Sequence, residues 1–177
     1  MSTSEATPFP GRSPAGNEFV ISRTFDAPRD LVWQAWSEAE RLARWWGPKG
    51  FDIHVAKLDF RPGGIFHYRM ATKNGQEMWG RFIYQEITAP ERTVFISSFS
   101  NETGNVARAP FFDGGWPLEV HNTLTLVENG GRTTLTIRAY PIHATDAERK
   151  TFESNFDSMR QGFGGTFDQL AEYLVKT

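Results

Sequence analysis

No cysteine occurs among the 177 residues. This absence excludes disulfide bonds, thiolate nucleophiles and cysteine-ligated metals, and it fits a reducing compartment. No apolar run approaches the ~20 residues that a membrane-spanning helix needs. Residues 1–17 contain neither the basic region nor the apolar region of a secretory signal. We therefore expect a cytoplasmic protein without a membrane span.

Neither sign of charge is in marked excess. The 19 Lys and Arg and the 21 Asp and Glu are interspersed and give a formal net charge of −2. Binding to a nucleic-acid backbone requires a basic surface that contacts phosphates. Nucleic acid is therefore not expected as a partner.

Sequence motifs for catalysis and cofactor binding are also missing. There is no Gly-x-Ser-x-Gly elbow and no phosphate-binding loop. Gly162 to Gly165 falls inside a helical pattern, whereas a dinucleotide fingerprint lies between a strand and a helix. None of the four histidines is spaced i, i+4 from another, which disfavours a zinc site. We expect no catalytic residue, no metal and no cofactor.

Aromatic residues, in contrast, are abundant, with fifteen Phe and six Trp in a total aromatic share of 14%. Such side chains bury much apolar area, and they also line apolar pockets. An aromatic core and an aromatic-walled pocket both remain open at this point.

Short strands separated by turn signals dominate the chain. The expected strands are 19–25, 51–55, 65–71, 78–87, 93–99, 118–127 and 133–140. Asn74-Gly75 is a strong hairpin signal, and Gly63-Gly64 supplies turn conformations that other residues resist. A helix is expected to begin at Pro28. A capping box at Ser37 and Glu40 predicts a second one, which ends near Gly47.

A long helical pattern from Thr145 to Thr177 closes the chain. Its capping box is Thr145 with Glu148. One apolar stripe runs along it, formed by Phe152, Phe156, Met159, Phe163, Phe167, Leu170 and Leu174. Gly162, Gly164 and Gly165 each cost about 1 kcal/mol relative to alanine in a helix. Because the last two lie off the stripe, we expect a kink there, or the close approach of another segment.

This order of elements predicts an α+β fold, in which a curved antiparallel sheet wraps around the long C-terminal helix. Two short helices follow the first strand. Residues 18–177 are expected to form a single domain, and residues 1–17 a flexible lead-in.

Several motifs resemble one known family. They are Phe25-Asp26-Ala27-Pro28, Trp45-Trp46-Gly47-Pro48, Asp59-Phe60-Arg61-Pro62-Gly63-Gly64 and Ala89-Pro90-Glu91-Arg92. In these motifs, residues 18–175 look like the SRPBCC (START/Bet v-like) superfamily. More narrowly, the segment is similar to bacterial domains related to the C-terminal domain of the activator of heat-shock-protein-90 ATPase. The resemblance implies a helix-grip fold, often with a hydrophobic ligand cavity between sheet and helix.

Asn122 is the best polar candidate for such a cavity. It interrupts the apolar face that Val120 and Leu124 form on one strand. A buried amide needs hydrogen-bond partners, which are either backbone and water or a ligand. The full set of cavity candidates is Trp46, Phe66, Tyr68, Met70, Trp79, Asn122, Phe156, Met159 and Phe163. Which face of strand 78–87 looks inward stays open, because both faces carry large residues.

The long segment between Ser100 and Pro117 carries Phe111, Phe112 and Trp116, which are candidates for a gate because long loops are often functional. The leading hypothesis is a protein that binds a hydrophobic or amphipathic small molecule, as a monomer or a homodimer. The alternative is a protein-binding module like a chaperone cofactor, with the same aromatics as a docking patch. A cyclase- or hydrolase-type enzyme on this fold ranks third.

Overall fold

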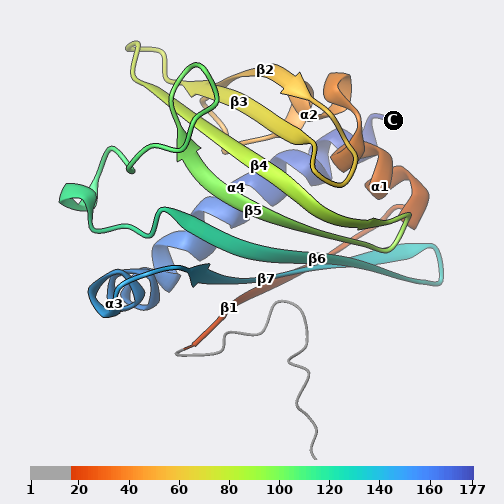
Figure 1. The fold of residues 1–177 in the computed structure, drawn as a ribbon. Helices are drawn as coiled ribbons and strands as arrows, with labels where there is room; N and C mark the ends of the chain where they lie inside the picture. Colours follow the sequence, from red (N-terminus) through yellow and green to blue (C-terminus); the bar gives the residue numbers. More distant parts are fainter. Residues whose placement is uncertain (1–16) are drawn as a thin grey trace, which may run out of the picture.

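Figure 1 shows the computed structural model, which describes residues 17–177. All but one residue of the predicted flexible lead-in, 1–17, therefore lie outside the described residues. The elements are β1 (Phe19–Phe25), α1 (Arg29–Ser37), α2 (Ala39–Trp45), β2 (Asp52–Leu58), β3 (Ile65–Ala71), β4 (Glu77–Thr88), β5 (Arg92–Ser100), the 3-10 turn η1 (Phe112–Gly114), β6 (Glu119–Asn129), β7 (Arg132–Ile142), α3 (Asp146–Ser154) and α4 (Phe156–Val175).

The strands form one antiparallel sheet in the order β1-β7-β6-β5-β4-β3-β2. Strands β2 to β7 form a meander, and β1 pairs with β7 at one edge. The sheet curves around α4, which runs diagonally behind it in Figure 1, while α1 and α2 cover the end of the sheet where α4 finishes. The predicted α+β class and helix-grip architecture are confirmed.

All seven predicted strands are present, and β1 and β3 have the predicted bounds. The structure also shows which side chains of strand β4 face α4 and which face away from it. Phe82 and Tyr84 are buried on the concave face, and so Trp79 and Ile83 lie on the convex face, because side chains alternate along a strand. Within residues 17–177 no helix combines the length and apolar composition needed to cross a membrane.

The C-terminal helix departs from the prediction. Its capping box is confirmed, with the Glu148 N–H donating to the Thr145 hydroxyl at 3.1 Å. The helix then breaks at Asn155, whose side chain donates to the Thr151 carbonyl at 2.7 Å and competes with helical bonding there. At the glycines, where the sequence predicts a kink, α4 continues without a break. Close approach explains Gly165, where a Cβ would lie 3.3 Å from Cβ of Pro48.

The predicted capping box at Ser37 and Glu40 is also wrong. Ser37 is still the last residue of α1, and Glu38 takes the N-cap position of α2 without a side-chain cap. The Glu38 carboxylate instead accepts a hydrogen bond from Arg41 at 2.7 Å. The sequence matches the capping-box pattern, but the N-cap of α2 lies one residue after Ser37, so Ser37 cannot cap the helix.

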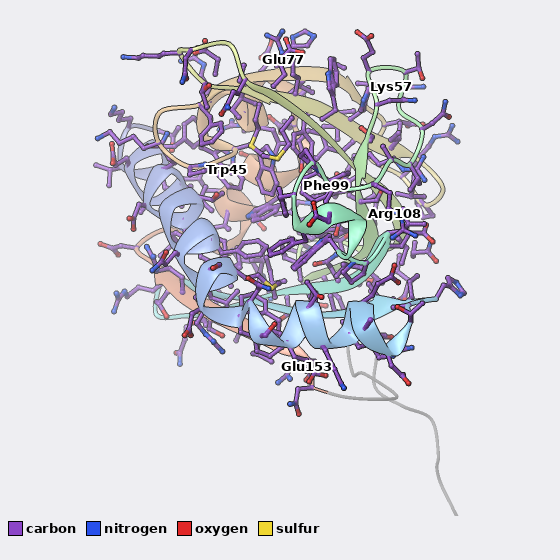
Figure 2. All side chains as sticks on the ribbon, turned by 90° about the vertical axis from the view of Figure 1, so that its left-hand side faces the viewer. Trp45, Lys57, Glu77, Phe99, Arg108 and Glu153 are labelled. Carbon is purple, nitrogen blue, oxygen red and sulfur yellow. The ribbon has the colours of Figure 1, made fainter. Side chains whose placement is uncertain are left out.

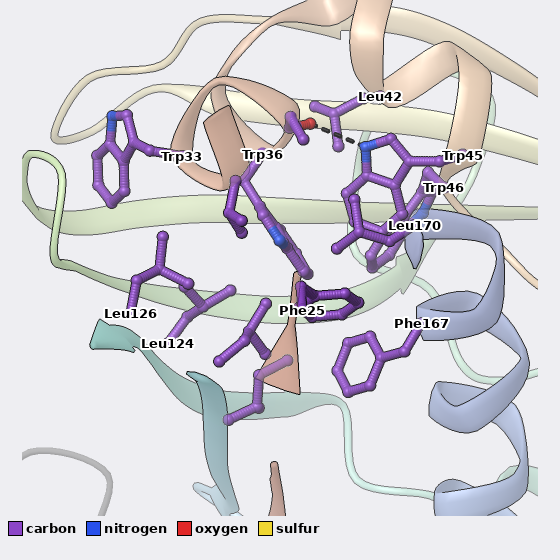
Figure 3. Packing of buried hydrophobic residues seen from close by; sticks show 14 of the residues in the cluster. Phe25, Trp33, Trp36, Leu42, Trp45, Trp46, Leu124, Leu126, Phe167 and Leu170 are labelled. Carbon is purple, nitrogen blue, oxygen red and sulfur yellow. Dashed lines mark hydrogen bonds between the residues drawn. The ribbon is translucent and has the colours of Figure 1, made fainter. Parts of the chain in front are cut away.

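Three tryptophans join the small helices to α4. The rings of Trp36, Trp45 and Trp46 meet edge to face, with centroids 4.8–5.6 Å apart. The indole N–H of Trp45 donates to the carbonyl of Ala35 at 2.9 Å, as the dashed line in Figure 3 shows. Phe167 of α4 is fully buried in the same cluster. Trp45 is thus a structural anchor, because its polar atom is satisfied and its ring is enclosed.

Candidate functional site

Three neighbouring spaces adjoin the concave face of the sheet, and residues of α4 line two of them. The outer chamber, of about 310 Å³, is lined by Trp46, Gly47, Pro48, Met70, Phe99, Met159, Gly162, Phe163 and Thr166. The inner chamber, of about 130 Å³, is lined by Trp36, Trp46, Tyr68, Phe82, Phe95, Ser97, Asn122, Ile137 and Phe163. The side chamber, of about 110 Å³, is lined by Tyr68, Ser97, Ser98, Phe99, Trp116, Pro117 and Val120.

Shared walls make these spaces adjacent. Trp46 and Phe163 border both the outer and the inner chamber. Tyr68 and Ser97 border the inner and side chambers, and Phe99 borders the outer and side chambers. A ligand longer than one chamber can therefore extend into the next once a bordering side chain moves.

Asn122 sits at the inner end, where strand pairing places it between Phe95 of β5 and Ala139 of β7. It is 5% exposed. Its amide N–H₂ donates to the Ser97 hydroxyl at 2.9 Å and to the Val120 carbonyl at 3.0 Å. Because a carbonyl can only accept, this pairing fixes the orientation of the amide. The amide oxygen makes no hydrogen bond within the described residues and is available to a ligand.

Tyr68 folds across the neighbouring strand, over Gly80. The two residues are paired in register, and a Cβ at Gly80 would lie 2.5 Å from the Tyr68 hydroxyl oxygen. The absence of a side chain at Gly80 therefore makes room for the tyrosine between the inner and side chambers. Burial raises the pKa of the Tyr68 hydroxyl to about 12, and the nearby Trp46 N–H partly opposes this rise. Tyr68 is thus a neutral group that can donate a hydrogen bond.

Two indole N–H groups at the inner chamber are unsatisfied. The nitrogens of Trp36 and Trp46 are buried and have no hydrogen-bond partner among residues 17–177. Both side chains line the inner chamber. A buried donor without a partner is costly in an apolar interior, so these groups favour the entry of a molecule that carries an acceptor.

The predicted cavity residues divide into two groups. Trp46, Tyr68, Met70, Asn122, Met159 and Phe163 all line the chambers. Phe66 is fully buried behind them against Trp46. Trp79 instead stacks on His67 on the convex face, with centroids 5.0 Å apart. Phe156 packs against Phe19 at 5.4 Å and borders none of the three chambers.

Further residues line the chambers but were not among the cavity residues predicted from the sequence. Ser97 and Phe99 project into the chambers from β5, and Trp36 from α1. The signal that could have identified Ser97 and Phe99 is cross-strand pairing, because Phe82 is opposite Ser97 and Gly80 is opposite Phe99. That register depends on turns whose geometry the sequence does not specify.

The predicted gate residues cluster in the β5–β6 loop. Phe111 contacts Phe99 with centroids 5.2 Å apart, and Phe112 stacks on Trp116 at 5.4 Å. Figure 2 views the molecule from this end, where the short turn of the loop faces the viewer with Phe99 and Arg108 beside it. Phe112 has a φ of 61°, a left-handed conformation that is unusual for a bulky residue. The loop therefore lines the side chamber through Trp116 and contacts Phe99 of β5, which borders the outer and side chambers.

Arg108 fastens this loop to α3. Its guanidinium donates to the Glu148 carboxylate at 2.7 Å and to the carbonyls of Gly114 and Trp116 at 3.3 Å. The hydrogen bond from Arg108 lowers the pKa of Glu148, and the Thr145 N–H adds to this effect. The ionic contact is therefore fully formed at neutral pH. It weakens only as the pH falls through this lowered pKa, below the ordinary glutamate value of about 4.3.

Replacing Arg108 by glutamine should loosen the loop without unfolding the protein. We expect amide hydrogen exchange at residues 111–116 to quicken roughly threefold to tenfold at pH 7, because an exposed ion pair with added carbonyl contacts is worth about 1 kcal/mol. Arg149→Gln is the matched control, since its side chain makes no ion pair within the described range. Equal exchange in the two variants would show that Arg108 does not hold the loop.

Charged groups keep away from the chambers. Among residues 17–177, no Asp, Glu, Lys, Arg or His lines the walls. His67 and His121 lie on the other side of the sheet, where His121 stacks on Tyr140 at 4.8 Å. In the part of the chain that the structure describes, no group of three His, Asp or Glu side chains could hold a metal ion. The site as built offers shape, apolar contact and a few hydrogen bonds.

An antiparallel sheet that wraps a long C-terminal helix, with apolar chambers between the two, defines the helix-grip class of proteins. Within that class, the chain belongs to the family of activator of Hsp90 ATPase homolog 1-like proteins, whose sequence profile matches residues 26–175. The family resemblance noted in the sequence is confirmed. The search of curated proteins gave no match.

Several solved structures share this fold. A protein from Arthrobacter aurescens is similar with a TM-score of 0.74 at 26% identity, over 90% of this chain and 87% of that one. A protein from Nitrosomonas europaea gives 0.69 at 27% identity, over 90% and 94% of the two chains. A protein from Mycobacterium smegmatis gives 0.71 at 24% identity, over 90% and 91%, which shows the fold alone.

Proposed function

We propose that this protein binds a hydrophobic or amphipathic small molecule in the chambers between the sheet and α4. The observation that carries the proposal is the outer chamber, with apolar walls and a volume of about 310 Å³. Such a volume, with a few polar groups at one end, is typical of a small-molecule site. We further propose that residues 18–177 act as one binding unit in the cytoplasm.

An enzymatic role finds less support in the same walls. Acid–base or nucleophilic catalysis needs titratable groups that converge on the substrate. Tyr68 is the one titratable side chain among the residues that line the chambers, and burial keeps it protonated at neutral pH. The chambers are therefore better suited to holding a molecule than to transforming it.

Binding of N-phenyl-1-naphthylamine tests the proposal directly. This neutral probe fluoresces more strongly in apolar surroundings, and its two ring systems suit adjacent chambers. We expect saturable emission with one site per chain and a dissociation constant on the order of 10–100 µM. Native mass spectrometry of the purified protein should show a co-purified ligand or the added probe. If neither method detects a bound molecule, the proposed function is wrong.

A protein-binding role is the second candidate, and one specific observation favours it. Phe111 and Phe112 are 41% and 42% exposed, although both are large and apolar. Neighbouring exposed aromatics are a common feature of docking surfaces. A pull-down with the chaperone Hsp90 would test this role, and loss of capture in a Phe111→Ser variant would locate the surface.

A further inference from the structure

The ligand's chemistry can be narrowed further, on the assumption that the proposed binding function holds. We propose that the ligand is an uncharged molecule whose hydrogen-bond acceptor receives the indole N–H of Trp46 at the inner chamber. The remainder of the ligand, which is apolar, extends into the outer chamber toward Met70 and Met159.

The first step concerns charge. In the part of the chain that the structure describes, no cationic side chain lines any of the three chambers, so a ligand carboxylate or phosphate would be buried without a counter-ion. An ion in such surroundings loses its hydration and gains no ionic partner, a strongly unfavourable change. An ammonium group is disfavoured for the same reason, because no anionic side chain lines the walls either. The buried part of the ligand is therefore neutral.

The second step concerns hydrogen bonding. Two groups that can only donate belong to side chains that line the inner chamber. The N–H groups of Trp36 and Trp46 lack partners, and the hydroxyls of Tyr68 and Ser97 each have a proton to donate. The amide oxygen of Asn122 is an open acceptor, and the two hydroxyls can also accept, whereas the two indoles can only donate. An acceptor such as a ketone, ether or ester oxygen matches this set better than a ligand that only donates.

The third step selects Trp46 among the donors. Its N–H lies close enough to the Tyr68 hydroxyl to affect the pKa of that group, but no hydrogen bond joins the two. Tyr68 borders the inner and side chambers. The N–H is therefore buried beside the side chain that separates these two chambers. Trp46 also borders the outer chamber and is 8% exposed. It is thus placed where the polar end and the apolar remainder of a ligand would meet.

The fourth step concerns size. An apolar cavity of about 150 Å³ accommodates benzene, and the inner chamber of about 130 Å³ is close to this. A single ring with a small polar substituent therefore fits there with little adjustment. Acetophenone, a neutral ring with one carbonyl acceptor, has this shape, and ethylbenzene has nearly the same shape without the acceptor.

The test titrates ¹⁵N-labelled protein with acetophenone, ethylbenzene and benzoate while the tryptophan indole N–H signals are recorded. We expect acetophenone to bind about tenfold more tightly than ethylbenzene and to move the Trp46 indole proton downfield. Benzoate should not bind. Trp46→Phe identifies the signal and should abolish the preference for acetophenone. Trp33→Phe, at an indole that packs on Phe60 outside the chambers, should leave the preference unchanged.

The outcomes separate this inference from the function on which it rests. Equal binding of the two neutral compounds, with an unmoved Trp46 signal, overturns the inference and leaves the binding function intact. Binding of benzoate as tight as that of acetophenone overturns the argument from charge. A preference that survives in a folded Trp46→Phe variant assigns the donor elsewhere. Failure of all these compounds and of N-phenyl-1-naphthylamine overturns the proposed function itself.

Discussion

Replacing Gly64 by alanine should destabilise the protein by about 3–4 kcal/mol, a large effect for the addition of a single methyl group. A Cβ at Gly64 would overlap the carbonyl oxygen of Asp59 and would lie 2.9 Å from its carbonyl carbon and 3.0 Å from the Arg61 oxygen. These are backbone atoms, and they cannot turn away as a flexible side chain can.

The surrounding hydrogen bonds prevent relief of this overlap. The Asp59 N–H donates to Ile65 at 2.8 Å, and the Tyr84 N–H donates to the Gly64 carbonyl at 3.0 Å. A backbone shift at Gly64 would therefore weaken the connection between the turn and β4. The pairing of β3 with β4, which presents Tyr68 to the chambers, would suffer with it.

Gly63→Ala provides the matched control in the same turn. Gly63 has a φ of +83° but open space around the position of a Cβ. Its replacement costs only the left-handed conformation, about 1–2 kcal/mol. Urea denaturation followed by circular dichroism should show both losses, with the one at Gly64 clearly larger. Equal losses would show that steric overlap at Gly64 is relieved after all.

This contrast shows the limit of predicting a turn from its residues. The pattern Arg61-Pro62-Gly63-Gly64 predicts a turn in which both glycines adopt backbone conformations that other residues resist. In the structure this holds for Gly63, which has a positive φ. Gly64 is required instead because backbone atoms lie too close to it for a Cβ. The approaching atoms belong to Asp59 and Arg61 of the same turn. Their position depends on how the turn folds back on itself, and residue types alone do not specify that geometry.

The site residues that could be predicted from the sequence are those that a local pattern along one strand reveals. Phe66, Tyr68 and Met70 alternate along a strand, so their shared face followed from the period of two. Asn122 was identified because it interrupts an apolar face. Trp79 could not be placed, since large residues occupy both faces of β4. The deciding fact is the pairing of Gly80 with Tyr68, which puts the tyrosine ring over a residue without a side chain.

The C-terminal helix illustrates a competition between local and long-range signals. The apolar stripe predicts one continuous helix, yet α3 ends at Asn155, whose side chain donates a hydrogen bond to the Thr151 carbonyl. The glycines were expected to weaken the middle, yet α4 passes through them unbroken. Packing of Phe167 and Leu170 in the core offsets the poor helix propensity of Gly162 and Gly164. These glycines therefore need a reason other than flexibility, and the outer chamber supplies one for Gly162.

Gly162→Leu should close the outer chamber and reduce the affinity for N-phenyl-1-naphthylamine more than tenfold. Gly162 lines that chamber from α4, and a Cβ there meets no atom within 4 Å. A leucine side chain would occupy the space beside Met159 and Phe163 that we assign to the ligand. Stability should rise rather than fall, because leucine is a better helix former than glycine by roughly 0.5–1 kcal/mol and gains apolar contacts. Fluorescence titration and thermal unfolding measure the two effects.

Gly164→Leu separates occupation of the chamber from stiffening of the helix. Gly164 lies on the same helix, also with nothing within 4 Å of a Cβ, but it borders none of the three chambers. This variant should gain helix stability and keep the affinity of the unaltered protein. If both variants lose the probe, binding depends on a flexible α4. If neither loses it, the probe binds outside the outer chamber, and the glycine at its mouth has no part in ligand binding.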